Sequence, residues 1–188
     1  MGASVAAGVA AFAATNLDDL FLLVAWFAAG RYRTATVVAG QFAGIAALFG
    51  LSAAASLLAW VVPGDQVAWL GVLPIGLGLH GLLTRNAHRP EAREAEAAAV
   101  PASGALAVAL VTVANGADNL AVYVPLFATS SATAVGIYAA VFAAMTALWC
   151  AAARWLVRHP DAGAPLRRLG PRAVPYVLIG IGVWILLR

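Results

Sequence analysis

Charged residues are scarce in this chain. Only 10% of its 188 residues are Asp, Glu, Lys or Arg, against roughly 25% in a typical soluble domain. Lysine is absent, so all eleven basic residues are arginines. Hydrophobic residues make up 63% of the chain, and the mean hydropathy is +0.90. This composition predicts an integral membrane protein that has the lipid bilayer as its surroundings and little mass outside it.

Other classes are excluded by what the sequence lacks. Cys150 is the only cysteine, so an internal disulfide and dithiol redox chemistry are impossible. The net charge of +3 is spread over scattered arginines, which argues against a nucleic-acid partner. A glycine-rich phosphate loop is absent, and the N-terminal run does not resemble a cleaved signal peptide. We therefore expect no enzyme activity and no resident cofactor.

Charges and turn residues divide the chain into six apolar segments. Their continuous apolar character favours helices over the alternating strands of a barrel. The segments cover approximately residues 4–29, 36–62, 67–83, 103–128, 134–157 and 174–187. The sequence thus predicts an all-α membrane protein with six transmembrane helices, forming a single transmembrane domain over residues 1–188.

The arginines are unevenly distributed between the two sides that six spans would define. Ten of the eleven fall on one side: Arg31, Arg33, Arg85, Arg89, Arg93, Arg154, Arg158, Arg167, Arg168 and Arg172. The positive-inside rule places this side in the cytoplasm. Both termini and the Pro63-Gly64-Asp65 turn are then expected outside, in a bacterial cytoplasmic (inner) membrane.

The two halves of the chain resemble each other. Asn16-x-x-Asp19 in the first segment matches Asn115-x-x-Asp118 in the fourth, and Pro74 in the third segment matches Pro175 in the sixth. Repeat one would span about 1–84 and repeat two about 101–188, joined by a cytoplasmic linker at 85–100. Because each repeat has three spans, the repeats would be inverted, which is a common plan of secondary transporters.

Polar residues interrupt the middle of the first and fourth segments. A carboxylate at this depth costs several kcal/mol, so it needs a partner or a task. On continuous helices each polar set forms one stripe, and the repeat symmetry would bring the stripes together. Their oxygen atoms suit a divalent cation. The candidate ion-binding residues are Thr15, Asn16, Asp18, Asp19, Thr112, Asn115, Asp118 and Asn119; the candidate metal ligands are Asp18, Asp19, Asp118 and Asn119.

These motifs resemble the cadmium-resistance transporter (CadD) family. The matching stretches are Ala14-Thr15-Asn16-Leu17-Asp18-Asp19-Leu20, Gly40-Gln41-Phe42-Ala43-Gly44, Leu70-Gly71-Val72-Leu73-Pro74-Ile75-x-Leu77-Gly78, Asn115-Gly116-Ala117-Asp118-Asn119-Leu120 and Tyr123-Val124-Pro125-Leu126-Phe127. The resemblance implies membership of the lysine-exporter (LysE) superfamily of small inner-membrane proteins with inverted three-helix repeats. It also implies efflux of cadmium or related divalent cations, with Asp18 and Asp118 as the best-matched acids.

We therefore predict a secondary transporter that exports a divalent cation as its substrate. Three buried carboxylates cannot all stay charged without a cation, which suggests exchange for protons. The oxygen-rich site leaves the native ion open between cadmium and a harder ion such as manganese, magnesium or calcium. Whether Asp18 or Asp19 is the main ligand, and whether the chain forms a homo-oligomer, also stay open.

Two other functions compete with this prediction. Export of an amino acid or another small solute is disfavoured, because no basic group lies within the segments to hold a carboxylate. An intramembrane aspartyl protease would also place two acids on two helices. It is disfavoured because Ala117, rather than glycine, precedes Asp118.

Overall fold

The computed structural model describes residues 1–57, 68–83 and 104–187, and its regular structure in these ranges is helical. The helices are α1 (Gly2–Thr15), α2 (Leu17–Ala29), α3 (Thr34–Leu57), η2 (Ala68–Gly71), α5 (Val72–Leu83), α7 (Gly104–Asn115), α8 (Ala117–Ala128), α9 (Ala132–Arg158), η3 (Pro160–Ala162) and α10 (Gly163–Leu186). The all-α prediction is confirmed for these residues.

The helices are long and apolar enough for a multi-pass membrane protein. By length and composition, α3 and α9 can each cross a membrane unbroken, and the bent pairs α1–α2 and α7–α8 can each form one further span. Two shorter apolar stretches complete the set, Trp69–Leu83 and Arg172–Leu186. The described helices thus provide two to four candidate spans, and the total of six stays a prediction.

The first and fourth segments are broken helices, so the prediction of continuous polar stripes is wrong. α1 and α2 meet at an angle of 58° at Asn16, and α7 and α8 meet at 69° at Gly116. The side chain of Asn16 donates to the carbonyl of Phe12, which competes with the helical ladder. Gly116 is a weak helix former, and the side chain of Leu48 leaves no space for a Cβ atom there.

The stretch between the fifth and sixth predicted segments is mostly helical, which corrects the start of the sixth segment. α10 begins at Gly163 rather than near residue 174. Arginine is a good helix former, and position 165 lies in the first turn, where proline has no hydrogen bond to lose. The predicted Pro63-Gly64-Asp65 turn and the linker at 85–100 lie outside the described residues.

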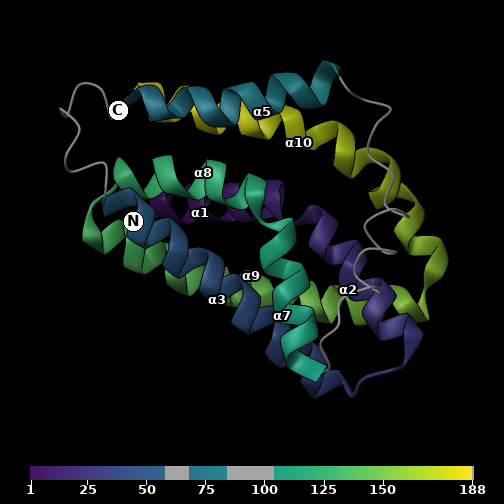
Figure 1. Cartoon of the computed structure of the whole chain (residues 1–188). Coiled ribbons are helices and arrows are strands. Elements are labelled where there is room, and N and C mark those ends of the chain that lie inside the picture. Colours follow the sequence, from purple (N-terminus) through teal and green to yellow (C-terminus); the bar gives the residue numbers. More distant parts are fainter. Residues whose placement is uncertain (58–67, 84–103, 188) are drawn as a thin grey trace.

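α3 packs lengthwise against the broken helix α7–α8 (Figure 1). A Cβ atom added to Gly40 would meet Val108 at 2.6 Å, and one added to Gly44 would meet Thr112 at 2.6 Å. Both pairs advance along the two helices in the same direction, so α3 and α7 run parallel. Glycine at these two positions allows this close approach.

α9 makes the corresponding contacts with the broken helix α1–α2. Its Phe142 ring lies 5.5 Å from Phe12 of α1, 5.7 Å from Phe49 of α3 and 4.6 Å from Tyr123 of α8, measured between ring centroids. These rings form an apolar centre that joins four helices. The polar residues at the helix breaks are therefore fixed on a rigid frame.

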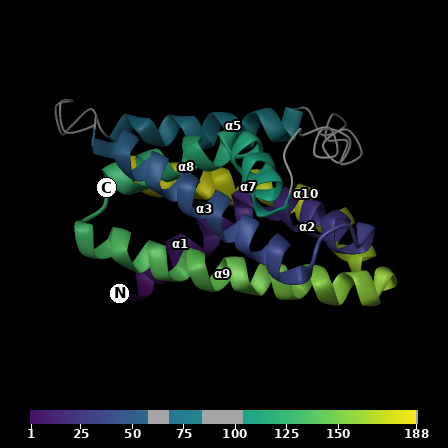
Figure 2. The same cartoon turned by 60° about the horizontal axis from the view of Figure 1, so that its bottom comes forward.

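α5 and α10 form a closely packed pair on the side of the bundle opposite α9 (Figures 1 and 2). A Cβ atom on Gly71 would lie 2.6 Å from the carbonyl oxygen of Gly182, and a Cβ atom on Gly182 would lie 2.5 Å from that of Gly71. Gly78 approaches the carbonyl of Pro175 in the same way. From Gly71 to Gly78 the contacting residue moves back from Gly182 to Pro175, so the two segments run antiparallel.

This contact gives a testable stability prediction. Gly182→Ala should destabilise the protein by roughly 1–3 kcal/mol, because the new methyl group meets backbone atoms that cannot move aside. Gly180→Ala in the same helix is the matched control, since nothing lies within 4 Å of a Cβ atom there. Thermal unfolding in detergent should show a lower midpoint for Gly182→Ala only. Equal midpoints for the two variants would contradict the close packing of α5 and α10.

Candidate functional site

The second halves of the two broken helices begin in the same way. The Oδ1 atom of Asp18 accepts a hydrogen bond from the backbone N of Asp19 at 3.0 Å, and that of Asp118 accepts one from the backbone N of Asn119 at 3.0 Å. Asp18 and Asp118 thus occupy the same position relative to the two helix breaks. The predicted repeat pairs Asp19 with Asp118 instead, because it aligns the two asparagines, and that pairing stays a prediction.

These carboxylates lie in the first turns of α2 and α8. The N-terminus of a helix carries a partial positive charge, which stabilises a negative side chain there. Each break also leaves backbone groups without helical partners at the middle of an apolar segment. Discontinuous helices of this kind form ion and substrate sites in several classes of membrane transporter.

Two acids of α2 are held by side chains of α7 and α3. Asn115 Nδ2 donates to Asp18 Oδ2 at 2.7 Å and to Asp19 Oδ1 at 3.1 Å. Gln41 Nε2 donates to Asp19 Oδ2 at 3.0 Å, and Thr112 Oγ1 donates to Gln41 Oε1 at 2.8 Å. The side chain of Asp19 is only 3% exposed. We call these five residues the acid cluster.

A second network, which we call the amide cluster, joins α1, α8 and α9. Asn16 Nδ2 donates to the hydroxyl of Tyr123 at 2.7 Å, and that hydroxyl also lies 2.9 Å from Thr15 Oγ1. Asn119 Nδ2 donates to Asn16 Oδ1 at 3.1 Å. The indole nitrogen of Trp149 donates to the backbone carbonyl of Asn16 at 2.6 Å. The first break is therefore tied to two other helices.

The structure thus brings seven of the eight predicted residues into these two clusters. The eighth, Asp118, bonds to the backbone of its own helix and lies within electrostatic range of Asp19. The buried Oδ1 atom of Asn119 accepts no hydrogen bond from the described residues. Among those same residues, no three His, Cys, Asp or Glu side chains lie close enough together to hold a metal ion.

Sequence reasoning missed three members of the clusters as site residues. Gln41 interrupts an apolar run between two glycines, and this isolated polar residue was the available signal. Tyr123 lies one helical turn after Asn119, so its hydroxyl continues the polar face of α8. Trp149 gave no local signal, because its partner Asn16 is distant in the sequence.

Broken apolar helices that carry hydrogen-bonded acids and amides at their breaks are typical of a multi-pass membrane transporter. A family model described as "Cadmium resistance transporter" matches residues 12–188, so the chain belongs to this family. No curated protein and no solved structure is similar enough to match it. Family membership and the apolar helices together show a transmembrane transporter of the cadmium-resistance class, whose activity is metal efflux.

Proposed function

We propose that the chain exports a divalent cation through a site at the two helix breaks. The observation that carries this proposal is the Asn115 amide, which holds Asp18 and Asp19 together from another helix. The neutral NH2 group of Asn115 bonds to both carboxylates. A cation in its place would bind them more strongly, because it carries a full positive charge. Asp118 lies in the equivalent turn of α8, within electrostatic range of Asp19, and would complete the site once α8 moves closer to α2.

The proposed ligands combine carboxylates with amide oxygens. Asp18 and Asp19, which Asn115 holds together, supply the negative charge that offsets the loss of water around a divalent ion, and Asp118 adds its charge from the neighbouring helix α8. The Oδ1 atom of Asn119 is buried and accepts no hydrogen bond within the described part of the chain, so it is available as a ligand. Asn115 would contribute its own oxygen once its N–H donors are displaced. Such a mixed oxygen set is typical of sites for divalent cations.

The choice of ion follows from these ligands. Oxygen donors suit manganese, magnesium and calcium, whereas cadmium is soft and also binds sulfur well. The single thiol, Cys150, packs in an apolar cluster with Leu20 and Leu23. We propose that the site is unselective enough to carry cadmium among several divalent ions.

We propose that protons are the exchanged ions. Asp19, at the centre of the acid cluster, is almost fully buried within the bundle. Without a bound cation the three acids repel one another, which favours a proton on at least one of them. Arrival of a divalent cation would then release that proton, so metal and proton movement become coupled.

We further infer six spans in two inverted three-helix repeats. α3 runs back along α2 after the short turn at 30–33, and it runs parallel to α7. The broken helix α1–α2 is therefore opposite in direction to α7–α8, as inverted repeats require. The matching hydrogen bonds at Asp18 and Asp118 also support two related halves.

We propose that both termini lie outside a bacterial inner membrane. The start of α1 and the end of α10 lie at one end of the bundle, whereas the α2–α3 turn and the end of α9 lie at the other (Figures 1 and 2). The second end carries Arg31, Arg33, Arg154 and Arg158, and the positive-inside rule assigns it to the cytoplasm.

The orientation can be tested with single introduced cysteines in a Cys150→Ser background. An impermeant thiol reagent added to intact cells should label Asp65→Cys and leave Ala97→Cys unlabelled until the cells are opened. The reverse pattern would show that the arginine-rich end lies outside.

Metal transport by purified protein is the direct test of the proposed function. Protein in liposomes should accumulate cadmium, and the same experiment repeated with manganese, magnesium, calcium and zinc would define the range of ions. Protein-free liposomes and liposomes loaded with an amino acid serve as controls. Movement of the amino acid without movement of any metal would overturn the proposal.

A further inference from the structure

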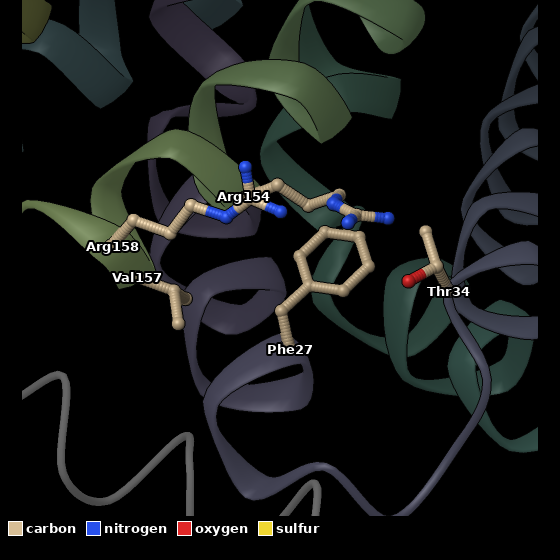
Figure 3. A pocket seen from close by; sticks show the side chains of 5 residues that line it. All are labelled: Phe27, Thr34, Arg154, Val157 and Arg158. Carbon is tan, nitrogen blue, oxygen red and sulfur yellow. The ribbon is translucent and has the colours of Figure 1, made fainter.

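A small pocket lies away from both clusters, at the arginine-rich end of the bundle. Its volume is about 120 Å³, and it is lined by Phe27 of α2, Thr34 of α3, and Arg154, Val157 and Arg158 of α9. The two arginine side chains extend from α9 toward Phe27 and Thr34 (Figure 3). Ligand pockets for larger molecules measure roughly 300–1,000 Å³, so this pocket suits one small chemical group.

The charge of the pocket favours an anion. Arg154 and Arg158 are separated by one helical turn, where two like charges destabilise each other. No carboxylate is among the described residues that line the pocket. Thr34 is the first residue of α3, so its hydroxyl and the partly positive N-terminus of that helix add to the two guanidinium groups.

The surroundings of the pocket correspond to the boundary between lipid and water. The rings of Trp26 and Tyr32 lie 5.6 Å apart at the end of α2, and the guanidinium of Arg31 lies 5.5 Å from the Tyr32 ring. Trp155 is 52% exposed on α9. Tryptophan and tyrosine concentrate at this level of membrane proteins. The floor of the pocket, Phe27 and Val157, is apolar.

We propose that this pocket binds the phosphate of an anionic membrane lipid. Arg154 and Arg158 hold the phosphate oxygens, the hydroxyl of Thr34 donates a third hydrogen bond, and the glycerol and acyl chains lie along the exposed apolar surface of α9. Basic pockets between membrane helices bind lipid headgroups by this chemistry. The occupied pocket links the ends of α2, α3 and α9 outside the cation site.

Lipid binding to purified protein tests this proposal. Detergent-solubilised protein is titrated with phosphatidylglycerol or phosphatidylcholine, and bound lipid is counted by native mass spectrometry. The double variant Arg154→Gln/Arg158→Gln should bind phosphatidylglycerol about 30-fold more weakly. Arg172→Gln, in the exposed part of α10, is the matched control and should bind as the natural protein does.

Further variants and ligands in the same experiment test the role of charge and distinguish binding of a lipid from binding of free phosphate. Arg154→Lys/Arg158→Lys keeps both charges and should retain most of the binding, which shows that the positive charges hold the lipid; an unchanged thermal unfolding midpoint of the glutamine variant shows that its loss of binding is not misfolding. The proposal is overturned if the double glutamine variant keeps its affinity for phosphatidylglycerol. It is also overturned if the two lipids bind equally, or if inorganic phosphate binds to the protein in phosphatidylcholine and excludes phosphatidylglycerol.

Discussion

Asp19→Asn is expected to lower the initial rate of metal uptake into liposomes by at least about 30-fold. A contact to a charged group contributes about 2 kcal/mol, which corresponds to roughly that factor. The rate should fall further for a divalent ion, whose attraction to a carboxylate is stronger than that of a single charge. Asp19 is almost fully buried, so water cannot take the place of the lost carboxylate ligand. Asparagine keeps the size of the side chain, so the change removes the charge with little effect on packing.

The control for this variant is Asp161→Asn. Asp161 is an exposed acid in η3, so its substitution makes the same chemical change outside both clusters. Uptake should be measured at equal amounts of incorporated protein. If Asp19→Asn transports metal at the rate of the control, the acid cluster is not part of the ion path.

Asp118→Asn is expected to abolish metal-driven proton movement. The variant keeps an oxygen donor and the shape of the side chain, but it cannot release a proton when a cation arrives. It also removes one of the charges that repel Asp19. We therefore expect weak residual metal binding that depends little on pH, together with loss of exchange. Internal pH and internal metal should be followed together in liposomes.

Asn119→Ala provides the comparison for the coupling experiment. It removes an amide that bonds to Asn16 and a potential metal ligand, but no charge. Transport should weaken while the ratio of protons to metal ions stays normal, and this ratio does not depend on how much protein is active. If Asp118→Asn also exchanges protons for metal at the normal ratio, Asp118 is not the coupling residue.

Most residues of the acid and amide clusters were predictable from the sequence, because charge is so costly inside a bilayer. Asp18, Asp19 and Asp118 stand out against apolar segments, and each needs polar partners at the same depth. Amide side chains stand beside both acidic positions in the sequence, Asn16 near Asp18 and Asp19, and Asn115 and Asn119 near Asp118. The all-helical architecture followed from the same scarcity of polar residues.

The geometry of the site was not predictable in the same way. Alanine-rich neighbours hide the helix breaks at Asn16 and Gly116, because their helix propensity favours an unbroken helix. Leu48 of α3 fills the space beside Gly116, a contact that the local sequence does not show. The bond between Gln41 and Asp19 likewise exists only after α3 has packed against its neighbours. Both contacts join residues that are distant in the sequence, so the local sequence could not predict them.

The side chain of Asn115 has a kinetic consequence. Its carboxamide carries two N–H donors on one side and an oxygen acceptor on the other. Half a turn about the Cβ–Cγ bond would move the N–H donors away from Asp18 and Asp19. The carboxamide oxygen would then face a cation bound by these two acids. Packed helices move in microseconds to milliseconds, whereas exposed side chains rotate in picoseconds to nanoseconds. Asn115 is half-buried and bonded to two carboxylates, so its rotation is slower than that of an exposed side chain, and in the proposed mechanism it is still a local step that needs no movement of a whole helix.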